Sequence, residues 1–166
     1  MYKRQALARE QSPSGYLPIE GIAPYRQLVQ NLVFGAEHEA VRAQRIATVQ
    51  TLGGSGALKL GADFIKHYFP DAEVWLSDPT WDNHLAIFQG AGLRTHSYPY
   101  YDAATGSLRF DAMLQTLREL PSGSVVLLHA SCHNPTGVDL SREQWQQLIP
   151  VLSLIHISEP TRLRRI

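Results

Sequence analysis

Short apolar segments alternate with helical segments from residue 73 to residue 151, and this alternation constrains the fold more than any other feature of the chain. The residue patterns predict strands at 73–77, 94–98 and 124–129, and helices at 83–89, 110–120 and 142–151. Strands separated by helices of this length form a parallel sheet that is covered by helices on both faces. The sequence therefore predicts an α/β fold, in which ligands bind at the carboxyl ends of the strands.

The part of the chain before residue 73 is less regular. Its patterns predict a helix at 25–34, a short strand at 46–51, and a mostly buried helix at 57–68. Nearer the other end, Ser141 and Gln144 have the spacing of a capping box, which predicts that the last helix begins at Arg142.

Charge and cysteine content exclude several classes of protein. Lys and Arg together number 15, as do Asp and Glu, so the chain lacks the basic field expected of a nucleic-acid or membrane-surface binder. There is no apolar run long enough to span a bilayer, so no membrane partner is expected. Cys132 is the single cysteine, which rules out an intramolecular disulfide and favours a cytoplasmic location.

The two ends of the chain do not continue these patterns. Residues 1–5 read MYKRQ and residues 153–166 read SLIHISEPTRLRRI, and both strings resemble translated sequencing-adapter DNA. We therefore expect the two ends to be artefacts and residues 6–152 to be a fragment of a longer protein. A genuine basic tail is the alternative.

A glycine-rich loop is the first candidate binding element. Gly53, Gly54 and Ser55 precede a predicted helix. Glycines let the backbone approach an anion closely, and a helix N-terminus offers unpaired N–H groups. The loop suits a phosphate, although it lacks the Lys of a Walker A motif. A glycine-rich turn without a ligand is the alternative.

Two further loops follow predicted strands. In SDPTWDNH, Trp81 can stack on an aromatic ring, with His84 close behind it, although both side chains would also fit a core. In HASCHNPTG, the spacing of the histidines and the cysteine matches no usual zinc site, so no metal is expected. Asn134, on a proline-fixed turn, can aim an amide donor at a ligand oxygen. A phosphorylated aromatic cofactor would use all three loops.

The motifs in these loops, and their order along the chain, are typical of one enzyme family. They are GYLPIEG at 15–21, QTLGGSGALKLGADF at 50–64, SDPTWDNH at 77–84, YYDAATGSLRFD at 100–111 and HNPTGVDL at 133–140. The chain closely resembles the amino-terminal half of the aspartate and aromatic amino acid aminotransferases, fold type I enzymes that use pyridoxal 5′-phosphate. The motif at 50–64 looks more like the aromatic (tyrosine) branch. The resemblance implies that residues 6–152 are an incomplete large domain, with part of its mostly parallel sheet and the flanking helices.

The resemblance also implies roles for individual residues. Gly53, Gly54 and Ser55 match positions that bind the cofactor phosphate, Trp81 matches the residue that stacks on the pyridine ring, and Asn134 matches the donor to the ring's 3′-oxygen.

Three more residues match family positions around the cofactor. His84 and His129 match histidines beside the ring. Tyr16 matches a tyrosine that reaches the phosphate of the neighbouring copy in a homodimer.

One part of the family's machinery is missing. The family requires a lysine that forms an imine with the cofactor, and none of the three lysines, Lys3, Lys59 and Lys66, lies in that motif. We therefore expect a fragment of a transaminase that acts on aromatic or dicarboxylic amino acids and 2-oxo acids, itself inactive. A short non-catalytic protein that binds pyridoxal phosphate or a partner, and a nicotinamide-binding oxidoreductase, are the alternatives.

Overall fold

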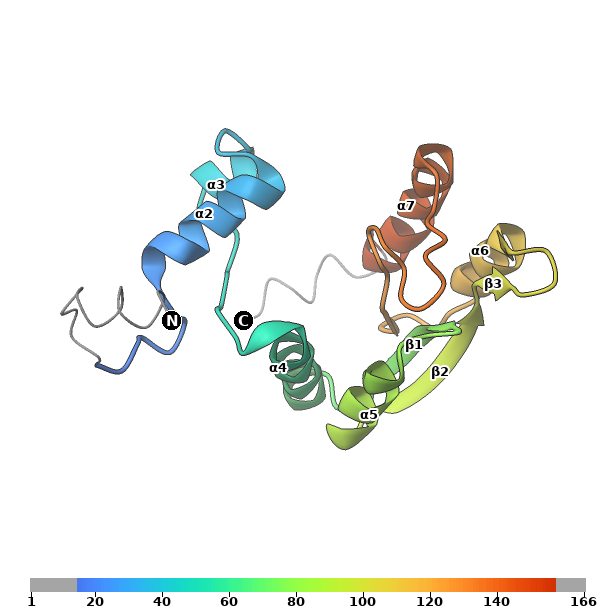
Figure 1. Ribbon diagram of the computed structural model, residues 1–166, viewed down its shortest axis with the longest axis horizontal. Helices are drawn as coiled ribbons and strands as arrows, with labels where there is room; N and C mark the ends of the chain where they lie inside the picture. The colour runs from blue at the N-terminus through green and yellow to red at the C-terminus, as the bar shows by residue number, and fades with distance from the viewer. Residues whose placement is uncertain (1–14, 158–166) are drawn as a thin grey trace, which may run out of the picture. The chain divides into compact units, whose positions relative to one another are not determined.

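The computed structural model of the chain describes residues 15–157 (Figure 1). The chain forms two compact units, one ending at Gly53 and the other beginning at Gly54. Within the described range, no helix has the length and apolar character needed to cross a membrane. Of the two predicted foreign ends, residues 1–5 and 158–166 lie outside the described residues.

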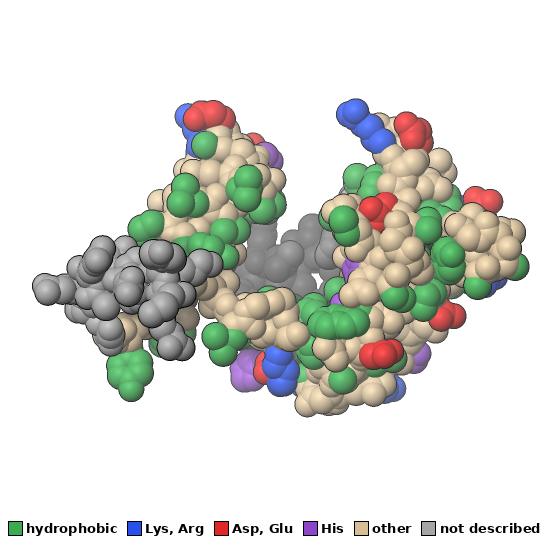
Figure 2. Space-filling view, in the orientation of Figure 1, with side chains coloured by type: hydrophobic (Ala, Val, Ile, Leu, Met, Phe, Trp, Pro, Cys, Tyr) green, Lys and Arg blue, Asp and Glu red, His purple; other side chains and the backbone are tan. Residues whose placement is uncertain are grey.

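The first unit contains two helices, α2 (Ala23–Phe34) and α3 (Glu39–Arg42). The predicted helix at 25–34 is confirmed, and it begins two residues earlier because Pro24 suits the first helical turn. None of the residues of α2 is buried within the chain. Figure 2 shows hydrophobic side chains on the surface of this unit. Leu28 and Leu32 of α2 are 67% and 85% exposed.

The strand predicted at 46–51 is wrong, because residues 46–51 lie outside any strand. The Gln30 side chain donates to the Ile46 carbonyl at 3.0 Å and to the Thr48 hydroxyl at 2.8 Å. The Gln50 N–H donates to the Glu20 carbonyl at 2.9 Å. This segment therefore bonds to α2 and to the stretch before it instead of to a neighbouring strand.

The second unit contains a parallel sheet of three strands in the order β2-β1-β5, which confirms the predicted α/β fold. The strands are β1 (Glu73–Asp78), β2 (Arg94–Pro99) and β5 (Val125–Val126). The helices of this unit are α4 (Gly53–Tyr68), α5 (Asp82–Gly90), α6 (Phe110–Arg118) and α7 (Arg142–Ile157). A two-stranded antiparallel pair, β3 (Tyr101–Asp102) and β4 (Ser107–Leu108), precedes α6.

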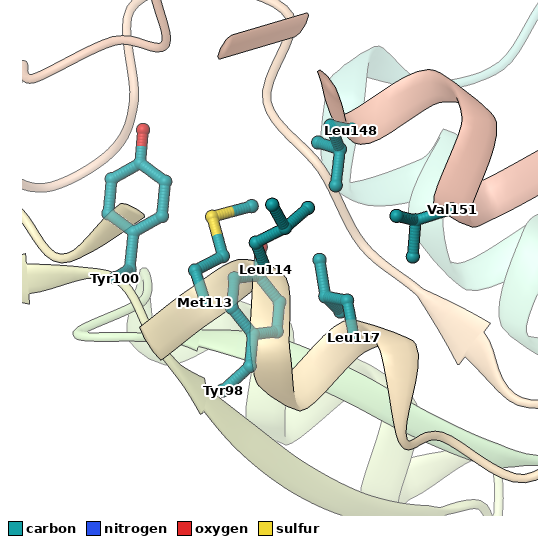
Figure 3. Close-up of a cluster of buried hydrophobic side chains, with 7 residues drawn as sticks. All are labelled: Tyr98, Tyr100, Met113, Leu114, Leu117, Leu148 and Val151. Atoms are coloured by element: carbon teal, nitrogen blue, oxygen red, sulfur yellow. The ribbon is translucent and has the colours of Figure 1, made fainter. Parts of the chain in front are cut away.

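Helices cover both faces of the sheet. Successive side chains of β1 point to opposite faces, so their contacts show which helices lie on each face. Val74 and Leu76 pack in one cluster with Ala62 of α4 and Phe88 of α5. Trp75 points to the other face, against the cluster formed by β2, α6 and α7. Figure 3 shows the buried members of that second cluster, which are Tyr98, Tyr100, Met113, Leu114, Leu117, Leu148 and Val151.

Helix α4 departs from its prediction in two ways. It begins at Gly53 instead of Ala57. The first N–H groups of a helix have no acceptor within it, so the glycine-rich stretch can form the first turn. The prediction that it is mostly buried is wrong, since Ala62 is its one buried residue among those described. Only one side of α4 meets the sheet, which leaves Phe64 and Tyr68 more than half exposed, at 55% and 60%.

Candidate functional site

The candidate site lies at the carboxyl edge of the sheet, where the loops after β1 and β5 meet. Val74 pairs with Val125 and Trp75 with Val126 in parallel register, so both strands end at the same edge. The first loop leads into α5 and carries Trp81, while the second runs from residue 127 to α7 and carries Asn134. The peptide bonds before Pro79 and Pro135, one in each loop, are cis.

Four of the predicted site residues form one continuous group at this edge. The rings of Trp81 and His84 meet edge-on with centroids 5.3 Å apart, and the rings of His84 and His129 are also 5.3 Å apart. The Asn134 backbone N–H donates to Nδ1 of His129 at 3.0 Å. Residues up to 53 positions apart in the sequence are thus brought together, from Trp81 to Asn134.

His133 extends this group, and the sequence analysis did not identify it as a site residue. It is 3% exposed, its ring lies 4.6 Å from that of His129, and it stacks on Tyr100 at 3.8 Å with an interplanar angle of 13°. Its Nε2 lies 2.9 Å from the Ser77 hydroxyl. The sequence signal was its place beside Asn134, but Ser77 and Tyr100, which bond to it and stack on it, lie far away along the chain.

Burial keeps all three histidines of the group uncharged at neutral pH. Loss of solvent lowers the pKa of His84, and the neighbouring His129 lowers it further. Loss of solvent also lowers the pKa of His129, although the carboxylate of Asp139 opposes the shift. Loss of solvent and the two other histidines lower the pKa of His133 to about 4, with Asp139 again opposing. The group therefore offers neutral imidazoles, which can donate or accept hydrogen bonds.

Hydrogen bonds engage Nδ1 in the rings of both His129 and His84. Nδ1 of His129 accepts a hydrogen bond, so the neutral ring carries its proton on Nε2. Nδ1 of His84 lies 2.8 Å from the Thr80 hydroxyl. In both rings Nδ1 is engaged by the protein, and Nε2 has no hydrogen-bond partner among the described residues.

The predicted phosphate loop forms the first turn of α4. This helix packs on the sheet through Ala62, and a connection of four residues, 69–72, joins its end to the start of β1. The glycines and Ser55 of the predicted loop open the helix. Gly54 and Ser55 are exposed there, and the first turn contains no acidic residue. Such a turn presents unpaired N–H groups and a positive dipole end to an anion.

The other residues considered in the sequence are Tyr16 and the lysines, of which Lys3 lies outside the described residues. Tyr16 belongs to the first unit, where its side chain is fully exposed. Lys59 pairs with Asp63 along α4, and Nζ of Lys66 donates to the Pro70 carbonyl at 3.0 Å. No three His, Cys, Asp or Glu side chains in the described part of the chain are arranged to hold a metal ion.

Known proteins are similar to this chain in sequence. The sequence profile of the family described as aminotransferase class I and II matches residues 2–154. The chain is 56% identical to an aromatic-amino-acid aminotransferase of Escherichia coli K12 over 145 residues, 87% of this chain and 36% of the relative. It is 55% identical to an aspartate aminotransferase of Pseudomonas aeruginosa over 141 residues, 85% of this chain and 35% of the relative.

A solved structure agrees in fold. The aromatic-amino-acid aminotransferase of Burkholderia pseudomallei, crystallised covalently bound to pyridoxal phosphate, superposes with a TM-score of 0.88 at 49% identity. The superposition covers 90% of this chain and 38% of that structure. The chain thus spans little more than a third of the length of the curated relatives that it matches.

Proposed function

Because the chain belongs to the aminotransferase class I and II family, we propose that it is part of a transaminase that uses pyridoxal 5′-phosphate. The enzyme would move an amino group between aromatic or dicarboxylic amino acids and 2-oxo acids. The observation that carries the proposal is the meeting of Trp81, His84, His129 and Asn134 at one sheet edge. A homodimer, in which Tyr16 reaches the partner copy's cofactor, and a cytoplasmic location belong to the same proposal.

The chemistry of this edge fits a flat, phosphorylated pyridine. Trp81 is partly buried and offers an indole face for a ring to stack on. The neutral imidazoles of His84 and His129 add no positive charge beside that ring. The first turn of α4 has no carboxylate to repel a phosphate.

Each residue of the edge then has a defined task. The N–H groups of Gly53 and Gly54 and the Ser55 hydroxyl bind the phosphate, and the Trp81 indole holds the pyridine ring in its plane. The Asn134 amide donates to the 3′-oxygen of the ring. When bound, the cofactor supplies the electron sink that transamination requires.

We propose that the chain alone binds the cofactor and does not catalyse transamination. Lys59 and Lys66, the lysines that the structure describes, are both engaged along α4. Neither lies at the carboxyl edge of the sheet, where a lysine would have to reach the cofactor. Incubation of the chain with cofactor, tyrosine or aspartate, and 2-oxoglutarate tests this, and turnover above that of free cofactor would contradict it.

A phosphate-dependent binding experiment tests the cofactor site itself. Pyridoxal 5′-phosphate and pyridoxal are titrated into the chain, and Trp fluorescence and near-ultraviolet absorbance are followed. S55A should weaken binding of the phosphate ester about tenfold, because a hydrogen bond to a charged group is lost, and should leave pyridoxal binding unchanged. S122A, at an exposed serine of a distant turn, is the matched control. Preference for a nicotinamide cofactor over both probes would reject the proposal.

A further inference from the structure

The loop that carries Asn134 is fastened to the sheet by its neighbours, whereas Asn134 itself is exposed. We propose that His133 is the positioning residue that holds the Asn134 turn against the carboxyl end of β1. The identity of the ligand in this inference rests on the proposed function. The contacts that hold the turn do not depend on it.

His133 is fixed on both sides of its ring. Its Nε2 lies 2.9 Å from the hydroxyl of Ser77 in β1, and its Nδ1 lies 2.8 Å from the hydroxyl of Thr136 within the same turn. The ring thereby joins the strand to the turn directly. Stacking on Tyr100, at 3.8 Å and 13°, fixes the plane of the ring. Ser77 is itself 4% exposed, so this bridge lies out of contact with bulk water.

The two ends of the turn are closed by contacts of their own. The carboxylate of Asp139 accepts from the backbone N–H groups of Cys132 and His133, at 2.7 and 2.8 Å. The hydroxyl of Tyr100 donates to the carbonyl of Val138 at 2.6 Å. Among these contacts, the bridge through the His133 imidazole is the one that reaches β1.

A histidine suits this position because both of its ring nitrogens can take part in hydrogen bonds while the ring stays neutral. Phenylalanine would keep the stack on Tyr100 and lose both bonds. The buried Ser77 hydroxyl would then lose its hydrogen bond to the imidazole, and loss of one partner of a buried polar group is costly. The turn would remain attached through Asp139 and Tyr100 but would be free to shift relative to β1, and the Asn134 amide would shift with it.

The test compares wild type with H133F and with H96F. His96 also stacks on an aromatic ring, that of Trp75, but it lies on β2 and is far more exposed, so H96F is the matched control. Amide hydrogen exchange of the Asn134 N–H is measured by NMR on the whole chain. Loss of the bridge should speed this exchange about tenfold in H133F, whereas H96F should behave as wild type.

A second measurement distinguishes a displaced Asn134 amide from a general loss of order in the turn. The 3′-oxygen of bound pyridoxal phosphate ionises more readily when the Asn134 amide donates to it. The pH midpoint of the near-ultraviolet absorbance change should therefore rise in H133F, toward the value in N134A. H96F should leave this midpoint unchanged.

The outcomes divide clearly between the two proposals. Faster exchange with a raised midpoint supports both. Faster exchange in a chain that binds no pyridoxal phosphate supports the positioning role and rejects the proposed function. Unchanged exchange and an unchanged midpoint in H133F overturn the inference. If H133F does not fold, S77A removes the bond to β1, and T136V removes the bond within the turn together with that from the Val138 N–H to the Thr136 hydroxyl. Each should speed exchange about threefold, and wild-type exchange in both variants would overturn the inference equally.

Discussion

Burial of the His133 imidazole makes the stability of the chain depend on pH in a defined direction. Its pKa is about 4 in the folded chain, against 6.5 for a solvated histidine. Between these values the unfolded chain binds a proton that the folded one does not, so the free energy of unfolding decreases as the pH falls from 6.5 to 4. His133 contributes at most about 1.4 kcal/mol per pH unit.

Proton NMR of the imidazole ring gives the His133 pKa directly, and urea unfolding between pH 7 and pH 4 gives the slope of stability. Because His84 and His129 contribute in the same direction, the comparison that isolates His133 is wild type against H133F, whose slope should be shallower. A midpoint near 6.5 for His133 would show that the ring is solvated.

The hydroxyl of Tyr100 can be tested separately from its ring. Y100F removes the donor to the Val138 carbonyl and keeps the stack on His133. We expect a loss of about 1 kcal/mol in the free energy of unfolding, measured with urea. Y68F, at a tyrosine that is 60% exposed, is the control and should change stability little. Equal effects of the two substitutions would mean that the Val138 bond does not form.

At this scale, the sequence was sufficient to predict Trp81 and Asn134 in loops after strands of one parallel sheet, and the family resemblance implied His84 and His129 beside them. It did not show the bridge from His133 to Ser77, since the two residues are 56 positions apart. That bond depends on how far each loop folds back over its own strand. The pattern of apolar and polar residues along the chain does not indicate how far a loop folds back.

Among the elements, the last helix has the most explicit start signal. The Ser141 hydroxyl accepts from the Gln144 N–H at 3.2 Å, and the Gln144 side chain accepts from the Ser141 N–H at 2.8 Å, so the predicted capping box is confirmed. S141A should cost about 1 kcal/mol of stability. S122A serves again as the control, and thermal unfolding followed by circular dichroism is the measurement. No difference between the two variants would show that the cap contributes nothing.

Helix α6 is held by apolar burial, as its one-sided pattern predicted. Leu117 is fully buried in the cluster that joins α6 to α7. L117A should destabilise the chain by about 2–5 kcal/mol, because it removes apolar contacts and leaves a cavity. L60A makes the same chemical change on α4, where Leu60 is 48% exposed, and should cost much less. Urea unfolding of both variants decides whether burial sets the difference.

The contrast between α6 and the segment at 46–51 shows where element prediction from sequence fails. Both have a clear local pattern, but a strand also needs a partner strand, and residues 46–51 have hydrogen-bond partners in Gln30 and Glu20 instead. A capping box or an apolar helix face involves residues within a few helical turns of one another. A strand forms only when a distant segment of the chain pairs with it.

At the scale of the whole molecule, each unit leaves large apolar side chains exposed among its described residues. Leu28 and Leu32 lie exposed one helical turn apart on α2, and the sheet ends at β5, which has only two residues. Exposed apolar faces and short unpaired sheet edges promote association. We expect the chain to self-associate at micromolar concentration in sedimentation velocity. L28K/L32K should reduce this association while circular dichroism stays unchanged, and a monodisperse wild-type monomer would contradict the prediction.

The bridge between His133 and Ser77 also has a consequence for the order of folding. It closes a loop of 56 residues, and the bond from Tyr100 to Val138 closes one of 38. Contacts this distant along the chain are entropically costly until the segments between them are already ordered. The Asn134 turn should therefore reach its final place only after β1 and β2 have paired, so that the proposed binding surface is among the last parts of the molecule to form. A cofactor bound as proposed would then meet an assembled sheet and an ordered turn, and would not guide how the strands pair.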